Sequence, residues 1–198
     1  MFDITPWRAT FKPIVYSTHS LGPLLRLIDE DLRWVSCFDT GSHINQQPDQ
    51  HDAMTANFRT ERNVVVRITC SFINNFKGGH HWLRVVGTEG TFERASGRGR
   101  IEPPRTLFNT TKLYGMGDIC ELPVDVSPPE HKGVSDGHGG ADYAMLDAFG
   151  RMLVEGTPNP IDLRQGLRMS LPGLFAAQSA ANNGELTKIR YPWDAKKG

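Results

Sequence analysis

The stretch that decides the fold is residues 52–72, DAMTANFRTERNVVVRITCSF. In its first part Met54, Ala56 and Phe58 alternate with polar residues, and the turn 59–63 (RTERN) follows. A largely apolar, β-branched run then returns over residues 64–72. Because side chains on a strand point alternately to its two faces, this pattern predicts a β-hairpin with one buried face.

Further strands are predicted on both sides of this hairpin, from runs of β-branched and aromatic residues. These strands are expected over Arg33–Asp39, His81–Val86 and Thr91–Arg94, near Ile101, over Glu121–Val126 and over Leu186–Ile189. The turn at residues 87–90 (GTEG) is short. Neighbouring strands joined by short turns predict an antiparallel sheet.

Three helices are predicted from apolar residues at helical spacing. They are expected after Thr18 (with Thr18 or Ser20 as the cap), over Gly140–Glu155, and from Asp162 to Asn182 with a kink at Pro172. The strands and helices are segregated along the chain. This order predicts one α+β domain over residues 1–198, an open, mainly antiparallel β-sheet with helices packed on one face.

The composition excludes several classes of protein. The chain has 22 basic residues (lysine and arginine) and 22 acidic residues (aspartate and glutamate). It therefore has no excess of positive charge with which to bind nucleic acid or an anionic membrane. No apolar run approaches the ~20 residues of a membrane span, and the N-terminus lacks the pattern of a signal peptide. The three cysteines form no CxxC pair. We therefore expect a cytoplasmic protein with reduced thiols that binds neither nucleic acid nor membrane.

Two segments could carry chemistry. Residues 16–23 (YSTHSLGP) place His19 beside Tyr16 at the start of a helix, and imidazole is suited to general acid–base work near neutral pH. Residues 137–143 (GHGGADY) surround His138 with glycines, which let a backbone approach a ligand closely. Both segments also have a plainer interpretation, as a structural histidine and as a linker before a helix.

Three further residues are candidates for binding a ligand or a metal ion. Arg8, beside Trp7, could hold an anionic or polyhydroxy ligand, although a surface arginine is also an ordinary finding. His80 and His81 are adjacent on a strand, so their side chains point to opposite faces and do not easily share a metal ion. No G-x-G-x-x-G loop follows a strand. No metal ligand and no cofactor-binding residue is therefore assigned.

The order of the motifs resembles the C-terminal domain of the glucose–fructose oxidoreductase / inositol dehydrogenase (Gfo/Idh/MocA) family, which has a dihydrodipicolinate-reductase-like fold. The resemblance rests on His19, the GTEG turn at residues 87–90 and the EGTP segment at residues 155–158, and covers nearly the whole chain. It implies a sugar or polyol oxidoreductase with NAD or NADP held by a Rossmann domain. We find no such domain here, and expect the C-terminal half of a longer oxidoreductase, inactive alone.

A narrower likeness involves the two chemical segments. Residues 16–23 are similar to the YPTHGLGP segment of NAD-dependent glycosidases of the α-N-acetylgalactosaminidase type, apart from Ser17, and residues 137–143 to their GHGGMDF/Y segment. This likeness implies that His19 is the catalytic residue, acting in proton transfer. The residues expected to contact the substrate are Tyr16, Arg8, Thr18, His138 and Tyr143. Dehydrogenase and redox glycosidase both stay open.

Two further expectations concern geometry and partners. His19, Tyr16 and His138 should converge on one polar cleft, on the side where a Rossmann domain would dock. The resemblance also implies a homodimer through the open face of the sheet. Two alternatives are a non-catalytic binding or dimerisation module that retains the fold, and metal-dependent hydrolysis by the histidines.

Overall fold

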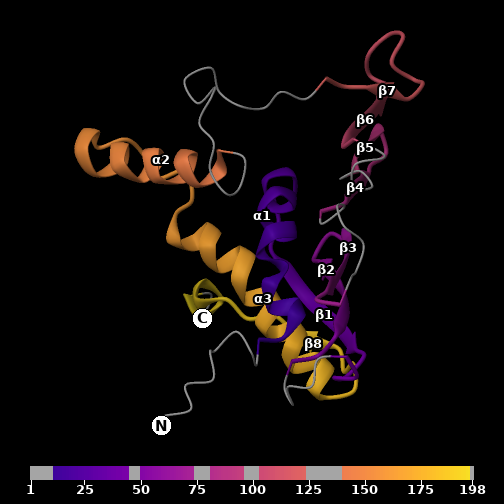
Figure 1. The fold of residues 1–198 in the computed structure, drawn as a ribbon, viewed down its shortest axis with the longest axis vertical. Coiled ribbons are helices and arrows are strands. Elements are labelled where there is room, and N and C mark those ends of the chain that lie inside the picture. Colours follow the sequence, from indigo (N-terminus) through magenta and orange to yellow (C-terminus); the bar gives the residue numbers. More distant parts are fainter. Residues whose placement is uncertain (1–10, 45–49, 74–80, 96–102, 124–139, 197–198) are drawn as a thin grey trace. The chain divides into compact units, whose positions relative to one another are not determined.

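The computed structural model describes residues 11–44, 50–73, 81–95, 103–123 and 140–196. The chain divides into two compact units, which we call the first unit (residues 1–75 and 163–198) and the second unit (residues 76–162). The first unit holds η2 (Pro13–Ser17), α1 (Thr18–Leu27), β1 (Leu32–Asp39), β2 (Ala53–Thr60), β3 (Val65–Ser71), α3 (Leu163–Ala181), β8 (Thr187–Lys188) and η4 (Pro192–Lys196). The second unit holds β4 (Leu83–Val86), β5 (Gly90–Ala95), β6 (Arg105–Thr110), β7 (Cys120–Glu121) and α2 (Ala141–Glu155) (Figure 1).

The predicted hairpin forms β2 and β3 in the sheet of the first unit. The strand order of this sheet is β3-β2-β1-β8, with every neighbouring pair antiparallel. Phe58 is the register partner of Val66 on one side and of Val35 on the other. All three side chains are buried, as are Met54 and Ala56. The alternation in the sequence therefore marks the face of the sheet that forms the core.

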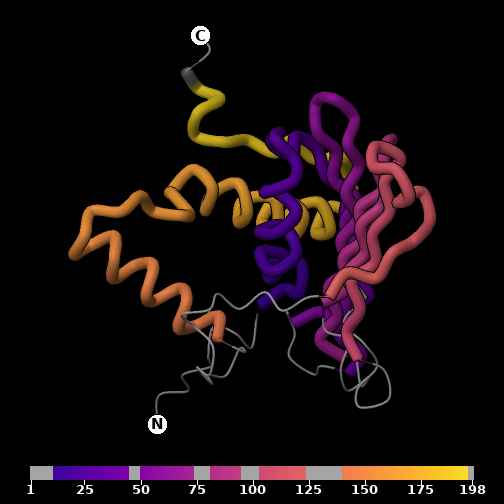
Figure 2. Tube along the Cα trace, turned by 90° about the horizontal axis from the view of Figure 1, so that it is seen from above, coloured from indigo at the N-terminus to yellow at the C-terminus, as the bar shows by residue number. Residues whose placement is uncertain are grey.

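Helices cover that sheet from one side. α3 packs on β1, η2 packs on β2 and β3, and α1 packs against α3; α1 and α3 lie on the same side of the strands in both views (Figure 1, Figure 2). α3 approaches η2 most closely at Gly173, where a Cβ atom would lie 2.9 Å from the Ile14 carbonyl oxygen and 2.9 Å from Ser17 Oγ. Because these separations are too short for a real Cβ, this packing requires glycine.

The second unit is built differently. Its antiparallel sheet has the order β4-β5-β6-β7. Val85, Phe92 and Phe108 form one row across it, yet each of the three is only half-buried. Among the described residues of this unit, only Thr106 and Thr110 are buried. α2 contributes no buried residue.

The α+β class predicted from the sequence is confirmed, with antiparallel strands and packed helices. The described strands form two four-stranded sheets, where the sequence suggested one run of strands. The expectation of a single domain over residues 1–198 stays a prediction. Within the described ranges, no helix combines the length and the apolar character that a membrane span needs.

Some element predictions were wrong in detail. β6 was not predicted, because its buried positions Thr106 and Thr110 carry hydroxyls and do not stand out as apolar. The strand expected over Glu121–Val126 is Cys120–Glu121 in the described part, and residues 124–126 lie outside it, as does Ile101. α1 has no side-chain cap from Thr18 or Ser20, because η2 runs directly into it.

Candidate functional site

The His19 segment lies where η2 joins α1. One side of this joint is buried: Pro13, Ile14 and Ser17 of η2, then Leu21, Leu24 and Leu25 of α1. These residues fix the backbone of the joint against the sheet and α3. Tyr16 and His19 lie on its other side and are exposed, with Tyr16 at 42%. The local sequence therefore presents an imidazole and a phenol together at the surface.

The two rings are in contact. The centroids of Tyr16 and His19 are 4.4 Å apart, with 40° between the ring planes. Phe11 and Phe72 contact Tyr16 edge-on, at centroid distances of 6.0 and 6.2 Å. We call these four residues the ring cluster. They come from three parts of the chain: the segment before η2, the η2–α1 joint, and the end of β3.

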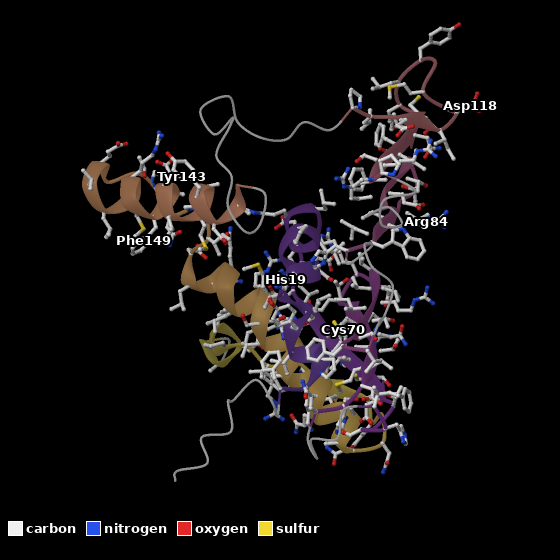
Figure 3. All side chains as sticks on the ribbon, in the orientation of Figure 1. His19, Cys70, Arg84, Asp118, Tyr143 and Phe149 are labelled. Carbon is white, nitrogen blue, oxygen red and sulfur yellow. The ribbon has the colours of Figure 1, made fainter. Side chains whose placement is uncertain are left out.

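Within the first unit, the structure brings together three of the predicted site residues. Tyr16, Thr18 and His19 lie within the η2–α1 joint, with Thr18 half-buried. Tyr143 lies on α2 of the second unit and is 42% exposed, and Figure 3 labels it and His19 on their separate helices. Arg8 and His138 lie outside the described residues. The predicted convergence of His19, Tyr16 and His138 therefore stays a prediction.

Sequence reasoning missed Phe11 and Phe72 as members of the site. The sequence predicts Phe72 only as the last residue of the second hairpin strand. Phe72 continues the alternation of the inward positions Val66 and Ile68, which predicts a core side chain and gives no signal of a contact with Tyr16. Its 41% exposure places it at the edge of the core rather than inside it. Phe11 carries no such signal in the sequence either.

A cavity of about 270 Å³ lies elsewhere in the first unit. Its lining is almost wholly charged: Asp29, Glu30, Asp31, Arg33, Glu61, Arg164 and Arg168. None of these was a predicted site residue. Asp31 is the centre of the cluster, with its carboxylate 2.9 Å from Arg168 Nε, 3.4 Å from Arg33 and 3.8 Å from Arg164. These arginines already form ion pairs with protein carboxylates. The cavity is therefore lined by an ion-pair network, and we do not assign it as a binding site for an anion.

The same network also forms hydrogen bonds with the C-terminal segment. Trp193 Nε1 donates to Asp31 at 2.9 Å, and Arg33 donates to Asp194 at 2.7 Å. The buried Tyr191 hydroxyl donates to the Leu32 carbonyl, and burial raises the pKa of that phenol. Desolvation opposes the charge on Asp194, but the backbone N–H of Tyr191 and the Arg33 guanidinium outweigh it and lower the pKa of this carboxyl. The role of these groups is structural.

Metal-binding and nucleophilic sites are not supported by the described residues. Within the described ranges, no three histidine, cysteine, aspartate or glutamate side chains are arranged to hold a metal ion. Asp52 accepts the backbone N–H groups of His43 and Ile44, so it organises the loop after β1. Burial raises the pKa of Cys37 to about 12 and of Cys70 to about 11. Both thiols therefore stay protonated, and poorly nucleophilic, near neutral pH.

The described fold does not fit a nicotinamide dinucleotide. Such a cofactor binds where a parallel strand ends in a glycine-rich turn that opens a helix. Every strand pair in the two described sheets is antiparallel. Gly140 directly precedes α2, but the residues before Gly140 lie outside the described part. We therefore assign no cofactor ligand.

Comparison with known proteins finds likeness in structure only. No protein-family profile matches the chain, and no curated protein matches its sequence. Among solved structures, aldose–aldose oxidoreductase from Caulobacter crescentus, in complex with glycerol, is 14% identical over 87% of this chain and 46% of its own, with a TM-score of 0.63. An oxidoreductase from Agrobacterium radiobacter, in complex with NAD+, L-tartaric acid and magnesium, is 17% identical over 88% and 48%, with a TM-score of 0.65.

A third structure is levoglucosan dehydrogenase in complex with NADH and levoglucosan. It is 14% identical over 89% of this chain and 49% of its own, with a TM-score of 0.66. The chain thus spans about half the length of the solved structures it matches. At these identities the likeness shows the fold alone. The chain shares its fold with about half of each of these three solved structures.

Proposed function

We propose that this chain is the substrate-binding domain of a nicotinamide-dependent sugar or polyol oxidoreductase of the Gfo/Idh/MocA family. The observation that carries the proposal is the exposed contact between Tyr16 and His19, 4.4 Å apart at the start of α1. Aldose–aldose oxidoreductase and levoglucosan dehydrogenase, which share the fold, are named for sugar substrates. Their names support a sugar-like substrate for this chain.

His19 would act as the base. Oxidation of a hydroxyl-bearing carbon requires a group that takes the hydroxyl proton, and a neutral imidazole accepts it through one ring nitrogen. The exposure of His19 leaves it within reach of a ligand. The Tyr16 ring beside it offers a flat surface for a sugar ring and a hydroxyl for a polar contact. The same base would serve a dehydrogenase or a redox glycosidase.

The remaining parts of the enzyme belong to the proposal as well. NAD or NADP would be held by a nucleotide-binding domain, since the described fold has no place for it, and the hydride chemistry is that of the cofactor. Arg8, Thr18, His138 and Tyr143 would supply further substrate contacts. A homodimer through an open sheet face would complete the assembly.

Ligand titration of the 198-residue chain, followed by NMR, tests the proposal. We expect myo-inositol or D-glucose, at millimolar concentration, to shift the side-chain resonances of His19 and Tyr16. NAD+ alone is expected to leave the spectrum unchanged. His19→Ala should abolish the response to the cyclic polyols.

The matched control is His81→Ala, which removes an exposed histidine of the second unit. This variant should bind the polyols as the unaltered chain does. Shifts spread over many surface residues, or a His19→Ala variant that still binds, would contradict the proposed site.

A non-catalytic binding or dimerisation module is a second candidate, and the second unit favours it. α2 exposes a set of large apolar side chains: Met145, Leu146, Phe149, Leu153 and Val154. Exposed apolar patches often mark protein contact sites. Sedimentation of the chain separates the candidates, because a module of this kind would self-associate yet show no polyol response at His19.

A further inference from the structure

We infer that Phe72 is a positioning residue for the Tyr16–His19 pair. It contacts the Tyr16 ring and, through that ring, determines the orientation of the His19 imidazole. The inference rests on the proposed function, because it concerns the same site. It goes beyond that function by adding a residue from a different part of the chain.

The core alone does not fix the Tyr16 side chain. The ring is 42% exposed, so only part of it is covered by its surroundings. His19 is on the same joint, three residues along the chain, and its ring contacts that of Tyr16. A fixed orientation of the phenol therefore requires contacts from another element.

Phe72 provides such a contact. Its ring meets Tyr16 at a centroid distance of 6.2 Å and an interplanar angle of 77°, the edge-to-face arrangement that aromatic pairs prefer. A contact of this kind shifts a side-chain population by roughly two- to tenfold. Phe11 adds a second edge at 6.0 Å and 88°.

The backbone of Phe72 is well placed to act as a support. Its N–H donates to the Asp52 carbonyl at 3.0 Å, which extends the β2–β3 pairing by one residue. Phe72 therefore follows directly on a hydrogen-bonded strand pair, and β3 packs against η2. A rigid strand end thus orients a ring on the exposed joint.

The role is one of positioning and not of core packing. Phe72 is 41% exposed, whereas the core residues of β3, Val66 and Ile68, are 7% and 5% exposed. Removing its ring should leave the fold intact and release Tyr16. The imidazole of His19 would then lose part of the ring current that a neighbouring phenol at 4.4 Å imposes on it.

The experiment is carbon–proton NMR of the His19 Cε1–H group in the 198-residue chain. Tyr16→Leu removes the phenol ring and defines the full displacement of that resonance. We expect Phe72→Leu and Phe72→Met to move the resonance in the same direction, by a large part of that displacement. Phe72→Tyr keeps a ring in place and should restore the native position.

Phe38→Leu is the matched control, because Phe38 is an aromatic residue of the same sheet with 61% exposure and no contact with the ring cluster among the described ring pairs. It should leave His19 unmoved. A His19 resonance unchanged in both Phe72→Leu and Phe72→Met would overturn the inference. Loss of the folded amide spectrum in these variants would also overturn it, since Phe72 would then be a core residue.

This outcome is independent of the proposed function. The His19 resonance is measured without ligand, so the positioning role can hold even if no polyol binds. If myo-inositol does bind, Phe72→Leu should weaken its affinity by roughly two- to tenfold. This is the factor by which the aromatic contact favours the Tyr16 orientation that binds the ligand.

Discussion

The two units differ in what they bury. Every buried apolar side chain among the described residues belongs to the first unit, where one face of the sheet meets η2, α1 and α3. The second unit has a regular four-stranded sheet and a 15-residue helix, yet buries no apolar side chain in its described part. Both units have good backbone hydrogen bonding. Among the residues that the structure describes, only those of the first unit form an apolar core, which is the main source of stability in a folded domain.

The difference teaches that secondary structure and burial are separate properties of a sequence. The α2 sequence carries apolar residues at helical spacing, and it forms the predicted helix. The apolar stripe nevertheless stays exposed, with Phe149 at 54% and Leu153 at 66%. Periodicity predicts the helix and its apolar face. It does not predict which surface covers that face.

The largest effect should come from a matched pair of phenylalanines. Phe58→Ala removes a side chain that is 1% exposed at the centre of the first sheet, and should lower the free energy of unfolding by about 3–5 kcal/mol. Phe149→Ala, on the exposed stripe of α2, should change it by less than about 0.5 kcal/mol. Urea unfolding followed by tryptophan fluorescence measures both. A large cost for Phe149→Ala would mean that the second unit has a core of its own.

The charged network gives the next largest effect. Asp31 is 9% exposed and meets three arginines and the Trp193 indole. Asp31→Ala should therefore cost about 2–4 kcal/mol, because it leaves half-buried guanidinium groups without their shared partner.

The matched ion pair in the second unit is that of Lys112 with Glu89, 3.0 Å apart with both side chains more than 60% exposed. Glu89→Gln should cost less than about 0.5 kcal/mol. The difference between the two variants, measured by the same urea unfolding, reports how much the first unit gains from a buried network. Equal costs would contradict a central role for Asp31.

Two glycines on α3 sharpen the comparison further. Gly173→Ala would bring a Cβ against the Ile14 carbonyl and Ser17 Oγ, so it should destabilise the first unit by about 1–3 kcal/mol. Gly166→Ala, on the same helix with open space around it, should stabilise by about 0.5–1 kcal/mol through helix propensity. Thermal unfolding measures both signs. A Gly173→Ala variant as stable as Gly166→Ala would mean that α3 does not press on η2.

The sequence allowed the class of fold and the strands of the first sheet to be predicted, because alternation at Met54, Ala56 and Phe58 has one physical meaning. Of the candidate site, the sequence allowed us to place together only residues that are close along the chain, such as Tyr16 and His19, which are three positions apart. Phe72 could not be assigned to it, since its contact with Tyr16 depends on how β3 packs against η2. The Asp31 network depends likewise on contacts between residues more than a hundred positions apart.

The smallest expected effect is a dependence on pH. Desolvation opposes ionisation of Asp194, but the Tyr191 N–H and the Arg33 guanidinium hold its pKa below the ordinary value of 3.8. A carboxyl with a lowered pKa stabilises the fold above its unfolded-state pKa, and this stabilisation is lost as the pH falls through the folded-state value. Because the Asp194 side chain is 34% exposed, the loss should be under about 1 kcal/mol.

Trp193 reports this change, since its ring stacks on Tyr191 with centroids 4.7 Å apart. Its fluorescence should change between pH 5 and pH 2, on the scale of ordinary carboxyl titrations, and Asp194→Asn should remove that component of the titration. The second unit offers the contrast: hydrogen bonds from Arg105 lower the pKa of Glu121, but that pair holds no tryptophan and covers no core. Glu121→Gln should therefore leave the acid transition unchanged. An acid transition that survives Asp194→Asn would place the sensitivity elsewhere in the ion-pair network, with Asp31 as the next carboxyl to replace.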